Sequence, residues 1–274
     1  MVSQEQRRRQ LAREKFLRQQ QRRTAARRKA RMRNSVIASV LGVVVIGSVA
    51  LYTTGVLKDG KDGKANASAK VTPSAAATSK APDPCAKPAA GSVKKLSWKN
   101  EPAMKIDTSA KYTMKLATTC GDIDIALKTS AAPHTVNSFD FLAGQGFFDH
   151  TKCHRLTTSN IYVLQCGDPT ASGSGGPGYT IPDENLKDAS LKGNVYPAGT
   201  VAMANTGQKH TGGSQFFLVY QDSPLPPSYT PFGTISASGL QVLKKIAAAG
   251  ENTGGGDGAP NATVVINKAS VTKS

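Results

Sequence analysis

An uncharged run of 24 residues, 34–57, constrains this chain more than any other feature of its sequence. The run is rich in Val, Ile, Ala and Leu, around the letters VIASVLGVVVIG. As a helix it would be about 36 Å long, enough to cross a hydrocarbon core of roughly 30 Å. The sequence therefore predicts a transmembrane anchor over residues 35–57, with any soluble domain on its C-terminal side.

The net charge of +17 is concentrated before the C-terminal part of the chain. Residues 1–34 carry thirteen Lys or Arg and two Glu, whereas residues 101–274 carry thirteen basic and thirteen acidic residues. A basic flank marks the cytoplasmic side of an apolar span. We therefore expect a cytoplasmic tail over 1–34 and an extracytoplasmic domain in a single-pass membrane protein. The alternative for the basic tail is nucleic-acid binding, which we consider weaker. The neutral C-terminal domain has no basic surface with which to bind the phosphate backbone of a nucleic acid.

The segment after the apolar run has the composition of a spacer. Residues 58–105 are dominated by Ala, Lys, Pro, Ser and Thr without periodicity, and such a composition cannot bury a core. We predict a disordered linker over 58–105 and one folded domain over 106–274. An A-x-A match at residues 65–67 keeps a cleaved signal peptide open as the alternative to an uncleaved anchor.

The C-terminal domain has the pattern of short strands and two isolated helices. Alternating apolar and polar residues, bounded by turn residues, predict strands at 112–118, 122–127, 161–166, 200–204, 215–220, 232–235 and 263–271. One amphipathic helix opens at Pro133 and stops at Gly144, and a second covers 240–249. This mainly β pattern predicts a closed antiparallel β-barrel capped by two helices.

Several chemical signatures are incomplete in this sequence. Residues 173–178 match G-x-G-x-x-G, but Pro177 continues a loop where a dinucleotide site needs a helix. No serine lies in a G-x-S-x-G elbow, which disfavours a hydrolase. His150, Cys153, His154 and Cys166 fit no zinc-ligand spacing. We expect no cofactor and no metal.

Four motifs occur in order along the domain: CHRL at 153–156, YVLQCGDP at 162–169, MAN at 203–205 leading to GSQFF at 213–217, and FG at 232–233. Together they resemble the cyclophilin family of peptidyl-prolyl cis/trans isomerases, whose signatures have the form HR…QGGD, MAN, GSQFF and FG. The resemblance covers residues 112–272, and the layout of the remaining chain resembles the membrane-anchored bacterial branch of that family.

The resemblance implies a role for each matching residue. Arg155 would be the catalytic residue and Gln165 would orient it. The residues implied in substrate binding are Tyr162, Val163, Ala204, Asn205, Gln215, Phe217, Leu225 and Tyr229. The implied substrates are Xaa-Pro bonds of exported or cell-surface polypeptides, whose folding the enzyme would assist. The alternative is a non-catalytic chaperone or scaffold that binds proline peptides on the same fold; loss of the arginine would mark it, and the arginine is present.

Two departures from the family pattern bear on the site. The spacing from Arg155 to Gln165 is two residues longer than is common, and Pro224 stands where relatives often carry a tryptophan. The only tryptophan, Trp98, precedes the predicted domain. Since proline has no N–H donor, the resemblance implies weakened binding of cyclosporin rather than loss of catalysis.

Four cysteines allow three disulfide connectivities. Cys153 and Cys166 flank a predicted antiparallel strand pair, where opposed residues lie about 4.5–5.5 Å apart and within reach of a bridge. This favours Cys153–Cys166, which leaves Cys85 for Cys120. The other connectivities stay open at this point.

Overall fold

The computed structural model describes residues 82–273, which belong to one compact unit, Ala76–Ser274. The predicted cytoplasmic tail, the predicted anchor at 35–57 and the first part of the predicted linker lie outside the described residues. Within residues 82–273, no helix has the length and apolar character that crossing a bilayer requires.

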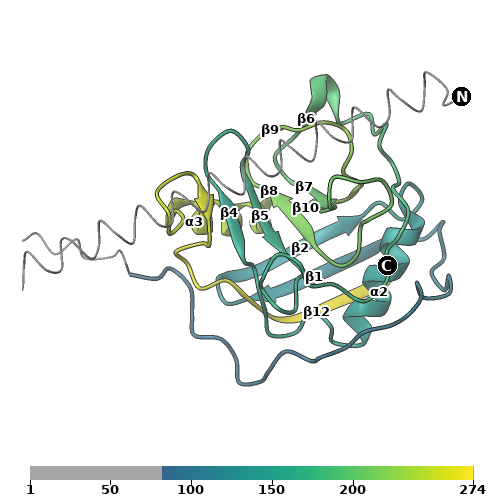
Figure 1. Ribbon diagram of the computed structural model, residues 1–274, viewed down its shortest axis with the longest axis horizontal. Coiled ribbons are helices and arrows are strands. Elements are labelled where there is room, and N and C mark those ends of the chain that lie inside the picture. Colours follow the sequence, from purple (N-terminus) through teal and green to yellow (C-terminus); the bar gives the residue numbers. More distant parts are fainter. Residues whose placement is uncertain (1–81, 274) are drawn as a thin grey trace, which may run out of the picture. The chain divides into compact units, whose positions relative to one another are not determined.

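Ten strands form one antiparallel sheet in the order β11-β4-β5-β8-β7-β10-β2-β1-β12-β3 (Figure 1). Their bounds are β1 (Tyr112–Thr118), β2 (Gly121–Leu127), β3 (Thr151–Lys152), β4 (Arg155–Thr157), β5 (Val163–Cys166), β7 (Thr200–Met203), β8 (Phe216–Val219), β10 (Pro231–Ile235), β11 (Asp257–Gly258) and β12 (Val265–Lys273). A separate two-stranded sheet pairs β6 (Val195–Tyr196) with β9 (Ser223–Pro224), and a short 3-10 helix, η1 (Lys192–Asn194), precedes β6.

The hairpin of β1 and β2 shows why the sequence forms this sheet. Met114 and Leu116 in β1, and Ile123 and Ile125 in β2, are buried, while the residues between them are not. This period of two places one apolar face of each strand on the core. The predicted alternation is confirmed here.

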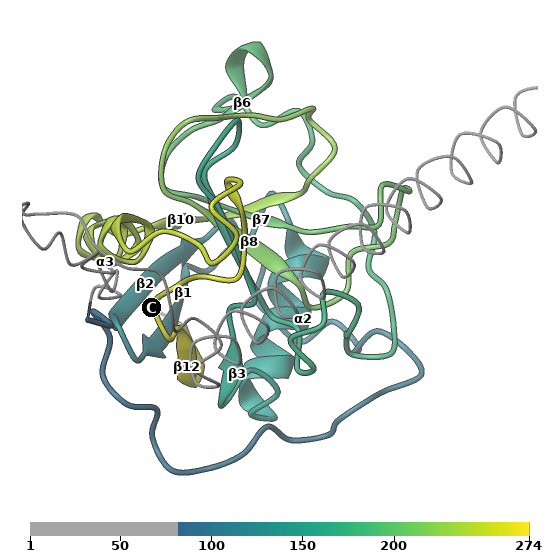
Figure 2. The same ribbon diagram turned by 60° about the vertical axis from the view of Figure 1, so that its left-hand side comes forward.

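The sheet is curled, but the predicted closed barrel needs correction. Among the described residues the outer strands β11 and β3 do not pair with each other. Segment 151–157 contains both β3 and β4, and β4 pairs with β11. Within this segment, Cys153 N donates to Val264 O on one side (3.0 Å), and His154 N donates to Gln165 O on the other (3.1 Å). One bent segment thus connects the two edges of the sheet without a continuous closing ladder. Figures 1 and 2 show the curled sheet.

Two helices pack against the sheet, as predicted. Helix α2 (Pro133–Gly144) has proline in its first turn and contacts β12. Its Phe139 ring lies 4.6 Å from Phe232 and 5.5 Å from Phe216, between ring centroids, so it joins the main core. Helix α3 (Ala237–Ala248) contacts β2 and is capped by Ser236, whose hydroxyl accepts a hydrogen bond from Gly239 N at 3.1 Å.

Residues 82–105, which we call the arm, correct the prediction of a disordered linker. The arm has no regular secondary structure, yet it lies along the outside of the domain as an extended blue segment in Figures 1 and 2. Ala86 N donates to Thr119 O (2.8 Å), and Trp98 N donates to Pro177 O (2.8 Å). The Trp98 ring packs on Phe141, with centroids 5.0 Å apart. The arm is ordered because it uses the core of the domain, which its own composition could not supply.

Both predicted disulfides are present. Cys153 is bonded to Cys166 beside the paired strands β4 and β5. Cys85 is bonded to Cys120 and thereby links the arm to the turn between β1 and β2. The favoured connectivity is confirmed.

Candidate active site

Strand pairing brings the predicted catalytic residues into one row. Arg155 of β4 lies opposite Gln165 of β5, and Gln165 lies opposite Phe217 of β8. Phe217 in turn lies opposite Ala202 of β7. Residues directly opposite in antiparallel strands share a face of the sheet, so a guanidinium, an amide and an aromatic ring line one surface.

This surface forms the floor of a small hollow of about 180 Å³, which we call the inner pocket. Eight of the ten predicted site residues line it, together with one that was not predicted: Arg155, Ile161, Val163, Gln165, Ala204, Asn205, Phe217, Leu225 and Tyr229. A buried apolar cluster of Val163, Tyr196, Ala202, Phe217 and Val219 supports it from beneath. The inner pocket therefore combines an apolar base with a charged rim.

Tyr196 holds the aromatic side of the inner pocket in place. Its hydroxyl donates to Tyr229 O (2.7 Å) and accepts from Tyr229 N (3.1 Å). Burial raises the pKa of Tyr196 to about 12, so the hydroxyl keeps its proton at neutral pH. The Tyr229 ring then stands edge-on to Phe217, with centroids 5.4 Å apart.

Tyr162 is the predicted residue whose placement differs most. It does not line the inner pocket; its ring packs edge-on against Tyr220, and its N–H donates to Ser223 Oγ (2.8 Å). Ile161 lines the pocket instead. Successive side chains in a strand point to opposite faces, so Val163 and Gln165 share their face with residue 161 and not with residue 162. The period of two was the sequence signal that could have found Ile161.

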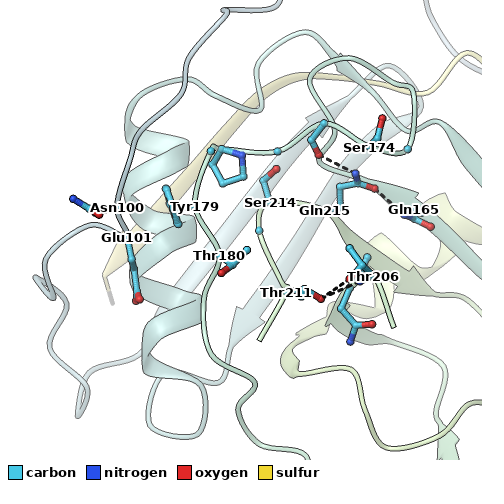
Figure 3. A pocket seen from close by; sticks show the side chains of 18 of the residues that line it. Asn100, Glu101, Gln165, Ser174, Tyr179, Thr180, Thr206, Thr211, Ser214 and Gln215 are labelled. Atoms are coloured by element: carbon cyan, nitrogen blue, oxygen red, sulfur yellow. Dashed lines mark hydrogen bonds between the residues drawn. The ribbon is translucent and has the colours of Figure 1, made fainter. Parts of the chain in front are cut away.

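Arg155 is held by a polar chain that crosses the site. Its Nη1 donates to Gln165 Oε1 (3.1 Å), and Gln165 Nε2 donates to Gln215 Oε1 (2.9 Å). Gln215 Nε2 then donates to Gly175 O (2.9 Å). Figure 3 marks the bond between Gln165 and Gln215 with a dashed line. Gln215 does not line the inner pocket, but it holds Gln165, which in turn contacts the arginine.

Asp257 is a partner of Arg155 that the sequence analysis missed. Its two carboxylate oxygens accept hydrogen bonds from Arg155 Nε (2.7 Å) and Nη2 (2.8 Å). This bidentate contact lowers the pKa of the Asp257 carboxyl and raises the pKa of Arg155. The two residues are 102 positions apart in the chain, so no local pattern joins them.

The loop before Asp257, residues 251–256, is held by hydrogen bonds to the Glu251 carboxylate. The Glu251 carboxylate accepts from Thr253 N (2.6 Å), from Thr253 Oγ1 (2.6 Å) and from Gly256 N (2.9 Å). Strand β11 then pairs with β4, next to Arg155. The carboxylate is thus held by backbone and side-chain bonds against the arginine.

Asp168 organises the loop on the other side of the site. It is fully buried, and its carboxylate accepts from Thr170 N (2.7 Å), Gly173 N (2.6 Å) and Gly175 N (3.1 Å). Burial alone would raise the pKa of Asp168, but these hydrogen bonds outweigh it and lower the pKa to about 2. The ionised carboxylate fixes the loop whose Gly175 carbonyl holds Gln215.

A larger hollow of about 770 Å³, which we call the side cleft, adjoins the inner pocket. Both are lined by Gln165, Ala204 and Asn205. The Asn205 side chain is occupied by other loops and its own: it donates to Ser228 O (2.8 Å), 23 residues away, and accepts from Gly207 N (3.0 Å). Figure 3 shows the side cleft, with Asn100 and Glu101 of the arm on one side and Thr206 and Thr211 on another.

Comparison with known proteins places this site in a family. Residues 113–271 match the model of the family described as "Cyclophilin type peptidyl-prolyl cis-trans isomerase/CLD". A "Probable peptidyl-prolyl cis-trans isomerase B" of Mycobacterium leprae is 53% identical over 173 residues, covering 60% of this chain and 58% of that protein. A protein of the same name from Mycobacterium tuberculosis is 52% identical over 165 residues, covering 57% of this chain and 53% of that protein.

A shorter relative matches over most of its length. The "Peptidyl-prolyl cis-trans isomerase B" of Bacillus subtilis is 41% identical over 128 residues, covering 46% of this chain and 82% of that protein. The chain spans little more than half the length of the two mycobacterial relatives. Through residues 113–271, this chain belongs to the cyclophilin type peptidyl-prolyl cis-trans isomerase family.

Proposed function

We propose that the domain catalyses cis/trans isomerisation of Xaa-Pro peptide bonds. The observation that carries this proposal is the Arg155 guanidinium, fixed by Asp257 and Gln165 at the rim of the inner pocket. A small apolar hollow beside a rigid cation suits a proline ring whose peptide bond must be rotated while the ring is held.

The reaction needs little covalent chemistry. Partial double-bond character gives the peptide bond a rotation barrier of about 18–20 kcal/mol. Isomerisation of an Xaa-Pro bond therefore takes tens to hundreds of seconds, although the two isomers differ by only about 0.5–1 kcal/mol. Shortening about 100 s to about 1 ms requires the barrier to fall by roughly 7 kcal/mol. No bond breaks, so neither a nucleophile nor a titrating base is required.

The proposed role of Arg155 follows from the hydrogen-bonding capacity of its guanidinium. Three of its N–H groups donate to Asp257 and Gln165, and a guanidinium carries five, so two remain for substrate. Rotation uncouples the prolyl nitrogen from the carbonyl and leaves it with a lone pair. A fixed N–H donor binds this twisted state more strongly than the planar one, which lowers the barrier.

A protease-coupled prolyl-peptide assay on the purified full chain tests the proposal. We expect turnover well above the uncatalysed rate, and loss of that turnover in Arg155→Ala. The alternative function, a non-catalytic chaperone or scaffold that binds proline-containing polypeptides, would give binding of the same peptide in a titration without any acceleration. Absence of acceleration in the wild-type chain would therefore contradict the proposed activity.

We also propose that the domain acts outside the cytoplasm, on exported or cell-surface proteins, from an anchor at residues 35–57. Two disulfides in the domain support this location, because disulfides persist mainly in oxidising compartments. The basic residues before the apolar run support a cytoplasmic N-terminus. Protease treatment of intact cells should degrade the domain while a tag on the N-terminus stays protected. Protection of both would contradict the orientation.

A further inference from the structure

The inner pocket is the first of three hollows that form a row, with the side cleft in the middle. The side cleft shares Gln165, Ala204 and Asn205 with it. A third hollow of about 470 Å³, the arm groove, shares Gly175 and Gly176 with the side cleft. The two outer hollows offer far more room than one proline ring takes in the inner pocket. Their position suits the polypeptide that continues beyond the proline.

The arm forms one wall of both outer hollows. Residues 93–97 line the arm groove, and residues 99–101 line the side cleft. The loop that Asp168 organises forms the facing wall. Residues 82–105 precede the segment that matches the family model, 113–271, so the family match does not include this wall.

The arm is held closely enough to act as a wall. Trp98 N donates to Pro177 O (2.8 Å), and its ring packs on Phe141 and Phe147. The contact with the loop is close at Gly178, where φ is +92°. A Cβ at that position would collide with Ser97 Oγ and lie 2.6 Å from the Trp98 carbonyl oxygen. Only glycine allows this approach of two backbones.

Positive charge predominates along this wall. Lys95 and Lys99 are exposed, and neither makes an ion pair within residues 82–273. Lys94 donates to Gln145 O (3.0 Å). The one acidic side chain on the wall, Glu101, is engaged, because its Oε1 lies 2.6 Å from His134 Nδ1. The wall thus carries three ammonium groups and one carboxylate, and the ammonium groups of Lys95 and Lys99 are the two that have no hydrogen-bonding or ion-pair partner within residues 82–273.

We infer that the arm extends the substrate cleft, and that Lys95 and Lys99 select polypeptides with acidic side chains near the proline. The inference rests on the proposed function, because it names the substrate class of the same site. A tetrapeptide would fill the inner pocket and gain nothing from the arm. A longer chain with Asp or Glu flanking the proline would reach the two lysines.

The test compares three longer peptides with one central proline, flanked on both sides by Glu, Gln or Lys, and a neutral tetrapeptide. With the full chain we expect kcat/KM to favour the Glu peptide over the Lys peptide by roughly threefold to tenfold, since exposed ion pairs are weak. The preference should shrink at high salt. Equal kcat/KM for the Glu and Lys peptides would overturn the inference.

A charge-reversed variant locates the effect. Lys95→Glu with Lys99→Glu should reverse the preference between the Glu and Lys peptides. Lys244→Glu with Lys245→Glu is the matched control, because these exposed lysines lie on α3 and the variant has the same net charge. If the control loses the preference equally, the general field of the protein selects the peptide and the assignment to the arm is wrong.

The two proposals fail in different ways. A wild-type chain that turns over none of the peptides would contradict the proposed isomerase activity. The same labelled peptides, followed by fluorescence anisotropy, would still report whether the Glu peptide binds more tightly and whether the arm variant reverses that order. Turnover of the tetrapeptide without any charge preference would contradict only the role of the arm.

Discussion

The inner pocket and the side cleft adjoin each other but are lined by different kinds of structure, strands in the first and irregular backbone in the second. The inner pocket rests on β4, β5 and β8, whose ladder bonds and buried side chains, such as Val163 and Phe217, fix its geometry. The side cleft is lined mainly by the arm and by loops, which Trp98 and the buried Asp168 carboxylate help to hold in place. The residues that we propose for catalysis thus lie on strands, whereas those that we propose for choice among peptides lie on irregular backbone, which can vary without changing strand register.

The largest expected effect lies in the inner pocket. Arg155→Ala should lower kcat/KM roughly 100- to 1,000-fold, the loss typical of removing one preorganised transition-state donor. Arg155→Lys should also be poor, because an ammonium does not reproduce the directed fork of a guanidinium. Thermal unfolding should change little, since the arginine is partly exposed. Lys152→Ala removes a nearby exposed charge and should leave turnover intact; near-normal activity of a folded Arg155→Ala would refute the assignment.

A second prediction concerns the loop between the two regions. The pKa of Asp168 is about 2 in the folded chain and roughly 4 in an unfolded one. Its contribution to stability is therefore complete above about pH 4 and is lost as the pH falls through 2. Asp168→Asn should reduce the free energy of unfolding at neutral pH by on the order of 2 kcal/mol and flatten its dependence on pH between 4 and 2.

Urea unfolding of wild type and Asp168→Asn across that pH range measures this effect. Asp140→Asn is a suitable control, because burial raises the pKa of that carboxyl instead of lowering it. Identical acid profiles for wild type and Asp168→Asn would show that the loop does not depend on the carboxylate.

The third prediction tests the outer edge of the inner pocket. Pro224 is exposed in β9, paired with Val195, and does not line the inner pocket, whereas its neighbour Leu225 does. We expect cyclosporin to bind weakly, because an indole N–H donor is missing. A lost neutral hydrogen bond costs about 0.5–1.5 kcal/mol, and lost contact adds to it. Pro224→Trp should tighten cyclosporin inhibition roughly tenfold to a hundredfold while short-peptide turnover changes little.

Titration of wild type and of Pro224→Trp with cyclosporin, followed by the loss of isomerase activity, tests this prediction. Tight inhibition of the wild type without any gain from the added indole would mean that other residues complete the inhibitor site.

The smallest effect is expected from the carboxylate behind the arginine. Asp257→Asn should lower kcat roughly threefold to tenfold, since a partly exposed ion pair is weak and the amide still accepts one hydrogen bond. KM should change less than kcat, because Asp257 acts by positioning Arg155. Asp257→Glu should restore part of the loss.

A double-mutant cycle separates positioning from a general structural role. In an Arg155→Ala background, Asp257→Asn should have no further effect on kcat. An equal loss in both backgrounds would show that Asp257 does not act through the arginine.

Local sequence patterns were enough to predict many of the secondary-structure elements and one disulfide of this protein. Proline and glycine at its ends marked helix α2, alternation marked β1 and β2, and the placement of Cys153 and Cys166 beside one strand pair predicted their bond. The motif residues also came together, because strand pairing aligns segments that each carry one short signature. The period of two along the strand also places residue 161, rather than residue 162, on the face of Val163 and Gln165.

Three features were decided only by tertiary structure. The contact of Asp257 with Arg155 joins residues 102 positions apart, and nothing near either one specifies the other. The edges of the curled sheet are joined by a single segment that pairs with strands on both sides. The composition of the arm predicts disorder, because the arm has too few apolar residues to form a core of its own. In the structure Trp98 packs on Phe141 of the domain, and Cys85 is bonded to Cys120. Sequence patterns report what a segment can do alone, whereas order in the arm comes from apolar surface and bonding partners that only the assembled domain provides.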